Sequence, residues 1–424
     1  MSASDVNRTV EGVWRIESAR LIAGLARIVR DVGVAEELAQ EALVAALEQW
    51  PESGVPDNPG AWLMGTAKHR AVDRLRRAEV HARKTRELTR DIEIRGQIEN
   101  PSLEAEIDDP FDDDLLRLIF TACHPVLSTD ARVALTLRLV GGLTTKEIAR
   151  AYLVSEATVA QRIVRAKRTL SEARVPFEVP ERDELADRLA SVLEVIYLVF
   201  NEGYAATAGD DWIRPELIEE ALRLGRILAE LLPSEPEVHG LVALMELHAS
   251  RSRARIGPSG EAVLLLDQDR SRWDWLLVGR GLGALERAQS TGGALGPYTL
   301  QAAIAACHAR ARVADDTDWQ RIVALYDGLA QLLPSPVVEL NRAVAIGMAF
   351  GPQAGLELVD ALASERALRG YHLLPTVRGD LLAKLGRDDE ARAEFERAAS
   401  LTRNAREREV LLERMAACSP RNGG

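Results

Sequence analysis

The sequence predicts an all-α protein, on three observations. Ala, Leu, Arg and Glu recur at helical spacing along the 424 residues, alternating β-branched runs are few, and aromatic residues make up only 4% of a chain that is 47% hydrophobic. The length is about two to four times that of a common domain, so we expect several domains. The three cysteines, Cys123, Cys307 and Cys418, form no CxxC pair, which indicates reduced thiols and neither a disulfide framework nor a zinc site. We expect no cofactor.

The first part of the chain predicts three helices in residues 1–90. The stretches "RIESARLIAGLARIVRD" and "VAEELAQEALVAALEQW" each place apolar residues near one face, and the Pro- and Gly-rich residues 51–60 end the second helix. A third helix is expected from about Ala61, with Trp62 and Leu63 facing inward. Its opposite face carries five basic residues, Lys68, Arg70, Arg74, Arg76 and Arg77.

Charge is distributed unevenly along the chain, whose formal net charge is -12. Residues 68–90 and residues 115–175 are both basic, with six more basic than acidic residues in each. Between them, residues 91–114 contain ten acidic residues and one basic residue and lack a sustained apolar stripe, which predicts a flexible acidic linker. The long part that follows residue 175 is again acidic.

The stretch "GGLTTKEIARAYLVSEATVAQRIVRAKRTL", residues 141–170, predicts a helix-turn-helix. Thr144 begins a capping box with Glu147, and Ser155 caps the second helix. In a helix-turn-helix the second helix enters the major groove of DNA. Its base-reading candidates are Glu156, Thr158, Gln161 and Arg162, and its phosphate-binding candidates are Arg165, Lys167 and Arg168. Two amphipathic helices with a solvated basic face are also common in all-α proteins, so this segment alone leaves DNA binding open.

The order of these segments resembles the extracytoplasmic-function (ECF) group of sigma-70 type factors. "DVGVAEELAQEALVAALEQW" looks like the polymerase-binding helix of that family, and "NPGAWLMGTAKHRAVDRLRR" looks like the helix that reads the minus-ten element. "LTLRLVGGLTTKEIARAYLVSEATVAQRIVRAKRTL" looks like the domain that reads the minus-thirty-five element. Together these resemblances cover about two-fifths of the chain.

The resemblance implies two further sets of binding residues. Asp31, Glu36, Glu37, Gln40 and Glu41 are the expected contacts to core RNA polymerase. The basic helix, with Trp62, Lys68, His69, Arg70, Arg74, Arg76 and Arg77, is expected to contact DNA at the minus-ten element. Trp50 and Trp62 are equally explained as core anchors, and His69 as a surface residue without a role.

About 250 residues follow the two sigma-like domains, and they also read as helical. In residues 372–404, small and aromatic residues stand at the intervals at which the two helices of a tetratricopeptide repeat pack. The stretches "FNEGYAA", "GLVALMELHASR" and "YHLLPTVRGDLL" resemble an ECF subgroup in which a tetratricopeptide-containing extension replaces the usual anti-sigma partner. The resemblance implies that the extension, residues 176–420, regulates the protein in cis.

One charged cluster, "LDQDRSRWDW", admits an enzymatic interpretation. It combines three carboxylates with two Arg and two Trp, and Glu202 lies in "FNEGY". No His/Asp/Ser constellation or phosphate loop accompanies the cluster, so ion pairs between helices or a docking surface explain it better. We therefore expect a protein that is not an enzyme.

The sequence thus predicts an alternative sigma factor with four parts: residues 1–90, the linker 91–114, residues 115–175 and the extension 176–420. Its expected partners are core RNA polymerase, promoter DNA and a ligand or protein bound by the extension. No signal segment or membrane span is evident, so a cytoplasmic location is expected. The alternatives are a helix-turn-helix regulator with a tetratricopeptide sensor that is not a polymerase subunit, and a scaffold that never contacts DNA.

Overall fold

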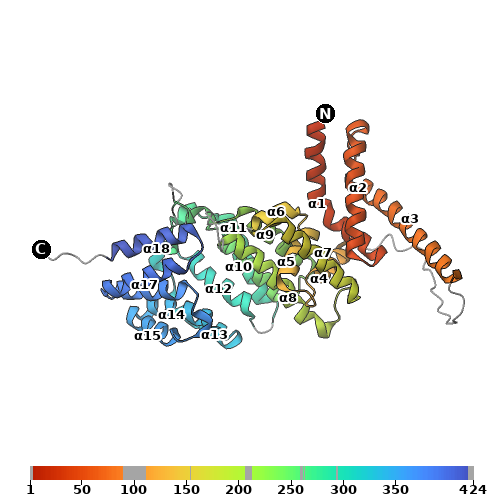
Figure 1. The fold of residues 1–424 in the computed structure, drawn as a ribbon. Coiled ribbons are helices and arrows are strands. Elements are labelled where there is room, and N and C mark those ends of the chain that lie inside the picture. Colours follow the sequence, from red (N-terminus) through yellow and green to blue (C-terminus); the bar gives the residue numbers. More distant parts are fainter. Residues whose placement is uncertain are drawn as a thin grey trace. The chain divides into compact units, whose positions relative to one another are not determined.

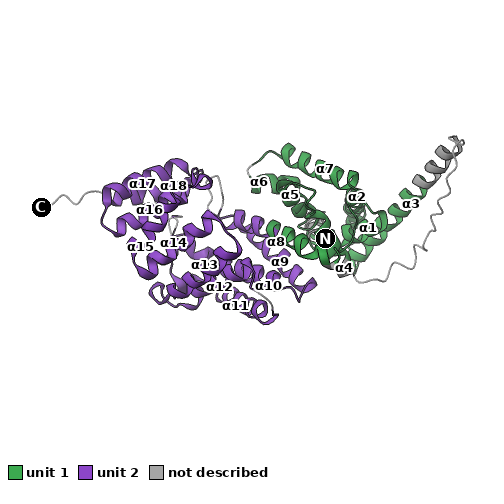
Figure 2. Ribbon diagram, turned by 90° about the horizontal axis from the view of Figure 1, so that it is seen from below, with its two compact units in different colours: residues 1–195 green, residues 196–424 purple. Residues whose placement is uncertain are grey.

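The computed structural model describes residues 3–88, 111–152, 154–205, 213–257, 261, 263–292 and 295–418 (Figure 1). Every regular element in these ranges is a helix, which confirms the all-α prediction. The chain divides into two compact units, residues 1–195 and residues 196–424, coloured separately in Figure 2. The long helix α8, Arg182–Tyr204, contains the boundary between them.

The N-terminal helical domain consists of three helices that pack on one another, α1 (Ala3–Val29), α2 (Val32–Ser53) and α3 (Pro59–Leu88). The side chain of Asp31 accepts hydrogen bonds from the backbone of Gly33 and Val34 and so caps α2. Helix α2 continues through Pro51 to Ser53, further than residues 51–60 suggested, and α3 begins two residues earlier than expected. Small residues such as Ala35, Ala39 and Ala42 line the buried face of α2 and let the helices approach closely.

The helix-turn-helix domain contains α4 (Phe111–Ala122), α5 (Thr129–Leu139), α6 (Thr145–Ala151) and α7 (Glu156–Glu172). Helices α5 and α6 both pack on α7. Gly142, with φ 69°, makes the left-handed turn between α5 and α6 that a residue with a Cβ seldom adopts. Because α4 begins at Phe111, the last four residues assigned to the linker belong to this domain, and residues 91–110 lie outside the described residues.

The two small domains are in contact within the first unit. Helix α1 packs on α4 and α5, and α2 approaches α7. Two carboxylates that are almost completely buried, Glu36 on α2 and Asp114 on α4, lie in this contact. The sequence predicts two domains joined by a linker, and its local patterns do not indicate this contact.

The second unit is a succession of helices that pack on their neighbours in chain order. It contains α9 (Pro215–Leu231), α10 (Pro236–Ala249), α11 (Trp275–Ser290), α12 (Pro297–Arg310), α13 (Trp319–Leu332), α14 (Pro336–Phe350), α15 (Pro352–Leu362), α16 (Leu373–Lys384), α17 (Asp388–Leu401) and α18 (Ala405–Ala417). Consecutive cores lie between α10, α11 and α12, then α12 to α14, and then α14 to α18. This chain-order packing is the arrangement of a helical repeat array.

The helix pair α16 and α17 has the packing that the repeat spacing predicted. A Cβ placed on Gly379 would lie 2.9 Å from Cε1 of Phe395, so the aromatic ring occupies the space that the glycine leaves. Ala391, Phe395 and Ala398 are buried against α16, and Gly386 makes the turn between the helices with φ 72°. The prediction of a tetratricopeptide-like helix pair is therefore confirmed at these residues.

Candidate nucleic-acid interface

The two helix starts of the helix-turn-helix are formed by the residues that the sequence indicated. The hydroxyl of Thr144 accepts from the backbone N–H of Glu147 at 3.1 Å, while the Glu147 carboxylate accepts from the backbone N–H of Thr144 at 2.7 Å. Ser155 caps α7 by accepting from the backbone of Thr158. These caps define where α6 and α7 begin, and thus which side chains of α7 point outward.

Helix α7 buries one apolar stripe, and most of its other side chains are exposed or half-buried. Val159, Ile163, Ala166 and Leu170 form the buried stripe. Of the base-reading candidates, Glu156 and Gln161 are exposed, and Thr158 lies beside the Ser155 hydroxyl at 2.8 Å. This N-terminal turn therefore presents polar groups to solvent, as a helix that reads base edges in the major groove must.

The remaining candidates on α7 have different environments. Arg165 is exposed, and Arg168 is exposed and paired with Glu172 at 2.6 Å. Arg162 forms an ion pair with Asp130 of α5 at 2.8 Å. Lys167 is the exception, because its ammonium contacts the buried carboxylate of Glu36 on α2. In this conformation Lys167 does not face the solvent side of the helix, where a phosphate would lie.

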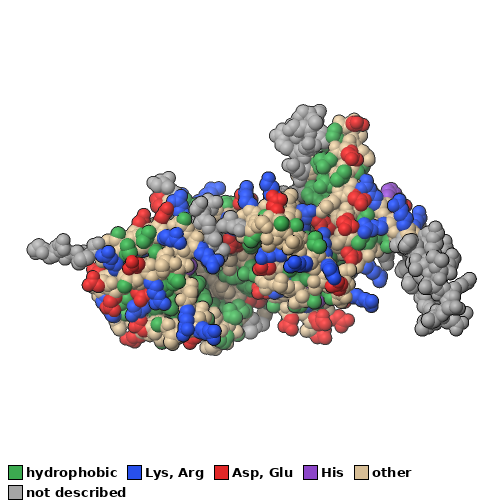
Figure 3. Space-filling model, viewed as in Figure 1, with side chains coloured by type: hydrophobic (Ala, Val, Ile, Leu, Met, Phe, Trp, Pro, Cys, Tyr) green, Lys and Arg blue, Asp and Glu red, His purple; other side chains and the backbone are tan. Residues whose placement is uncertain are grey.

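The acidic face of α2 and the basic face of α3 are paired with each other. Arg74 contacts Glu37 at 3.0 Å, and Arg70 contacts Glu41 at 3.2 Å. The side chains are 39–60% exposed, so each pair contributes at most about 1 kcal/mol and exchanges readily for another partner. Acidic and basic side chains are likewise intermixed on the face of the molecule drawn in Figure 3.

The other minus-ten candidates lie along α3. His69, Arg76 and Arg77 are exposed, Lys68 is half-buried, and Trp62 is half-buried with its ring edge-on to Trp50 at a centroid distance of 5.4 Å. Trp50 itself is only 1% exposed and is a core anchor. Trp62 thus combines a packed edge with an accessible one, which suits either a structural role or a contact with an unstacked base.

Glu36 is the centre of a charge cluster that joins the two small domains. Its carboxylate is 4% exposed and receives Arg138 of α5 at 2.7 Å, Lys167 of α7, and the side-chain amide of Gln40 at 2.7 Å. Asp114 forms a second cluster, with Arg27 of α1 at 3.4 Å and Arg117 at 2.8 Å. We call these two clusters and the contact that they hold the interdomain seam.

Sequence reasoning missed the seam, although one signal was present. Val32, Glu36 and Ala39 stand at helical spacing on the buried face of α2, so a carboxylate at position 36 required a basic partner from elsewhere in the chain. Arg138 and Lys167, its partners, are separated from it by more than one hundred residues, and no local pattern connects them.

The charged motif of the second unit is mainly structural. Asp269 caps the short helix at Arg270–Arg272, and Asp274 caps α11. Arg270 is buried and donates to the backbone carbonyls of His308 and Ala311 at the end of α12. Burial, together with Arg251 and Arg270, lowers the pKa of His308 to about 4, so this imidazole is neutral at pH 7.

Neither a metal-binding cluster nor a membrane-spanning helix is present among the described residues. No three His, Cys, Asp or Glu side chains lie close enough to hold a metal ion there. Nor does any helix in the described ranges have the length and apolar character needed to cross a membrane. The described cysteines are buried and unbonded, and burial raises the pKa of Cys123 to about 11.

Three family models match parts of this chain, and together they cover most of its helices. The model for sigma-70 region 2 matches residues 16–80, and the model for sigma-70, region 4, matches residues 117–170. A family of unknown function, DUF6596, matches residues 188–289. The region 2 match falls on α1–α3 and the region 4 match on α4–α7, in the order that the sequence resemblance indicated.

Comparison with individual proteins gives relatives of two kinds. An uncharacterized protein of Rhizobium meliloti is 45% identical over 392 residues, which are 91% of this chain and 90% of that protein. The probable ECF RNA polymerase sigma factor SigI of Mycobacterium tuberculosis is 29% identical over 174 residues, 40% of this chain and 57% of SigI. The ECF RNA polymerase sigma factor SigK of Mycobacterium bovis is 28% identical over 156 residues, 36% of this chain and 78% of SigK.

The region 2 match favours a sigma factor over a helix-turn-helix regulator that is not a polymerase subunit. The relatives named as sigma factors align with about two-fifths of the chain, whereas the Rhizobium protein shares almost its whole length. The chain belongs to the extracytoplasmic-function type of sigma-70 factors and carries a helical C-terminal extension of the DUF6596 kind.

Proposed function

We propose that this alternative sigma factor recognises promoters through two surfaces and core RNA polymerase through a third. Helix α7 reads the minus-thirty-five element with its exposed N-terminal turn, and α3 contacts the minus-ten element with its basic face. The acidic face of α2 binds core polymerase. The observation that carries the proposal is the capped helix-turn-helix, whose buried stripe leaves Glu156, Gln161 and Arg165 on the outer surface.

The seam implies that the closed conformation is a resting state. Glu36 is an expected contact to core polymerase, and Lys167 is an expected contact to a DNA phosphate. In this conformation the two side chains form an ion pair with each other. Neither can meet an external partner until α2 and α7 separate. Opening breaks the two ion-pair clusters, whose carboxylates and cations then regain hydration, and it also breaks the packing of α1 on α4 and α5.

We propose further that the extension controls the activity of the sigma domains and binds a ligand or a protein to do so. A helical array with consecutive small cores, as in α9–α18, offers long surfaces for a partner. One groove among residues 263–267, α14, α16 and α18 has a volume of about 660 Å³ and is partly apolar, with Met348, Val377 and Leu381 in its lining. Its two cations, Lys384 and Arg414, pair with Asp380 of the same lining. Such a groove suits an extended peptide with apolar side chains.

Run-off transcription with purified core polymerase tests the assignment of the surfaces. The variant E37K/E41K reverses two exposed charges of α2 and should abolish starts that depend on the protein, because it no longer binds core polymerase. E48K reverses an exposed charge at the far end of the same helix and should leave the starts intact. Equal activity of E37K/E41K and the unmodified chain would refute the role of α2.

Two further variants test promoter recognition and the role of the extension in the same assay. Gln161→Ala should lower the number of specific starts without changing the affinity for core polymerase, since the contact lies on the DNA side. Removal of residues 196–424 should change the number of starts in either direction if the extension is regulatory. An unchanged yield from the truncated chain would contradict control by the extension.

A further inference from the structure

An open cavity of about 1140 Å³ lies beside the seam, between the N-terminal helical domain and the helix-turn-helix domain. Its walls are the end of α1 and the start of α2 on one side, and α4, the end of α7 and residues 175–178 on the other. The volume is slightly above the range of about 300–1,000 Å³ found for small-molecule sites. Both domains therefore contribute to one pocket.

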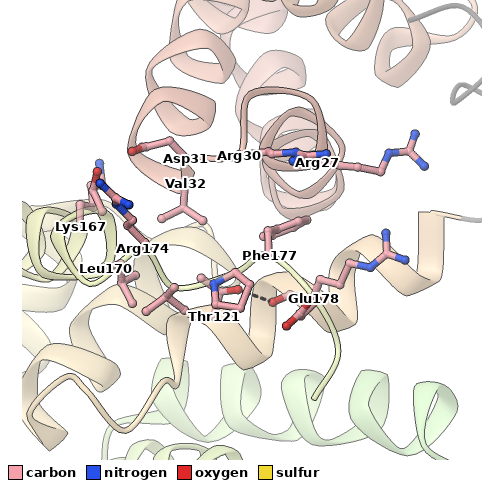
Figure 4. A pocket seen from close by; sticks show the side chains of 14 residues that line it. Arg27, Arg30, Asp31, Val32, Thr121, Lys167, Leu170, Arg174, Phe177 and Glu178 are labelled. Carbon is pink, nitrogen blue, oxygen red and sulfur yellow. Dashed lines mark hydrogen bonds between the residues drawn. The ribbon is translucent and has the colours of Figure 1, made fainter. Parts of the chain in front are cut away.

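The pocket is rich in cations that come from both domains. Figure 4 shows Lys167 and Arg174 on one side of it and Arg27 and Arg30 on the other, with Phe177 between them. Arg117 is the fifth cation of the lining. Only two carboxylates line the pocket, those of Asp31 and Glu178, so the lining has an excess of positive charge.

Some of these charges are already compensated, and two are not. Arg27 and Arg117 contact Asp114, and Lys167 contacts Glu36. In the part of the chain that the structure describes, the side chains of Arg30 and Arg174 form neither a hydrogen bond nor an ion pair, and both are exposed. The carboxylate of Asp31 is not available to neutralise these two arginines, because it caps α2 by accepting hydrogen bonds from the N–H groups of Gly33 and Val34.

The backbone at these two arginines is also unusual. Among the described residues, Arg30 and Arg174 are the non-glycine residues with positive φ, 54° and 50°. They follow the ends of α1 and α7, where glycine is the common choice because a Cβ is unfavourable in this conformation. Each position has instead a guanidinium that borders the same cavity, one from each domain. Unusual backbone of this kind is concentrated at binding sites.

We propose that this pocket binds a small molecule that carries several phosphate groups, and that the bound molecule holds the two domains in the closed conformation. Guanidinium groups bind phosphate oxygens in a bidentate manner, and Arg30 and Arg174 are available for it from opposite walls. Phe177 offers a ring against which a base can stack, so a nucleoside polyphosphate and inorganic polyphosphate share the required chemistry. Core polymerase, which on the proposed function requires the open seam, should displace the ligand.

Calorimetric titration of the full chain tests the site, with inorganic tripolyphosphate, ATP and adenosine as probes at one ionic strength. We expect tripolyphosphate and ATP to bind with one-to-one stoichiometry and adenosine not to bind. R30N/R174N should weaken both interactions by at least about tenfold, because charge-assisted hydrogen bonds are lost. Asparagine tolerates positive φ, so this variant keeps its fold, and circular dichroism verifies that it does.

The control variant is R20Q, which removes the same kind of charge from an exposed site on α1 outside the pocket. It should alter the affinity by less than about twofold, as expected for a distant, screened charge. F177A distinguishes the two sources of the phosphate. If F177A binds ATP more weakly but tripolyphosphate as well as the unmodified chain does, the ligand is a nucleotide. If the affinities for both probes stay in the same ratio, the ligand is inorganic polyphosphate.

Three results would overturn the proposal. They are the absence of saturable binding of either phosphate probe, an equal loss of affinity in R20Q, and occupation of the pocket by single-stranded DNA but not by ATP or tripolyphosphate. The titration needs no polymerase, so its outcome is independent of the proposed sigma activity. A second titration, in the presence of core polymerase, tests whether polymerase binding displaces the ligand: ATP binding should then be lost.

Discussion

The ion pair between Lys167 and Glu36 joins the two small domains, so a substitution of Lys167 perturbs the closed conformation directly. Lys167→Gln removes the ammonium from the seam while Glu36 retains Arg138 at 2.7 Å and Gln40 at 2.7 Å. The Lys167 side chain is 22% exposed, and the Glu36 side chain is 4% exposed. The substitution therefore weakens the seam without removing every partner of the buried carboxylate.

The size of the effect follows from the burial of the pair. Removing one member of a fully buried ion pair costs about 3–5 kcal/mol. Here the pair is partly hydrated and one cation remains, so we expect about 2 kcal/mol. At about 1.4 kcal/mol per tenfold change, the equilibrium shifts roughly thirtyfold toward the open state. If only the open state binds core polymerase, the apparent Kd falls by the same factor while the open state remains a minor one.

Fluorescence anisotropy of the labelled full chain with core polymerase, in the absence of DNA, measures this Kd. Leaving DNA out matters because Lys167 is also a candidate phosphate contact. Arg165→Gln is the matched control, since it removes a positive charge from an exposed site on the same helix. An unchanged or weaker affinity of Lys167→Gln, with Arg165→Gln at the same value, would refute the reasoning.

Three other predictions concern stability. Gly379→Ala should destabilise the second unit by about 1–3 kcal/mol in urea unfolding, because its Cβ would lie 2.9 Å from Phe395, whereas Gly370→Ala meets no atom within 4 Å and should cost less than about 1 kcal/mol. Thr144→Ala should cost about 1 kcal/mol by the loss of the cap, observed as faster hydrogen exchange in α6, and unchanged exchange would count against it. Burial lowers the pKa of His308 to about 4, so between pH 6.5 and 4 the unfolded chain binds a proton that the folded chain does not. The free energy of unfolding should therefore decrease as the pH is lowered through this range, by up to about 1.4 kcal/mol per pH unit. His308→Gln should show a shallower dependence on pH.

The helices and the helix-turn-helix were predictable because their signals are local. Thr144 with Glu147 and Ser155 with Thr158 satisfy hydrogen bonds within three residues, so the sequence alone defines the helix starts. The same holds for Gly379 and Phe395, whose spacing within one repeat predicts their contact. Periodicity is less reliable at helix edges: Ile16 and Leu47 are apolar residues of the two stretches "RIESARLIAGLARIVRD" and "VAEELAQEALVAALEQW", yet they are 70% and 39% exposed.

The relation between the two small domains was not predictable, because it depends on contacts between residues far apart in sequence. The acidic residues of α2 were interpreted as one exposed polymerase-binding set, although Glu36 is buried and Glu37 and Glu41 are exposed. Similarly, Lys167 was grouped with Arg168 by charge, and the fold assigns them to different surroundings. Charge patterns predict the presence of a basic surface but not which of its members a second domain neutralises.

A reversible cross-link across the seam is the measurement that tests the central claim most directly. A Cβ on Gly33 would lie 3.8 Å from Cβ of Lys167, within the separation of about 3.5–4.5 Å that a disulfide requires. The native cysteines are buried, so G33C/K167C should form this bond upon oxidation. In run-off transcription with core polymerase, the reduced variant should give specific starts and the oxidised variant none. Equal starts from both forms would contradict a closed resting state, and no starts from the reduced variant or the unmodified chain on a genomic DNA library would contradict the sigma-factor assignment itself.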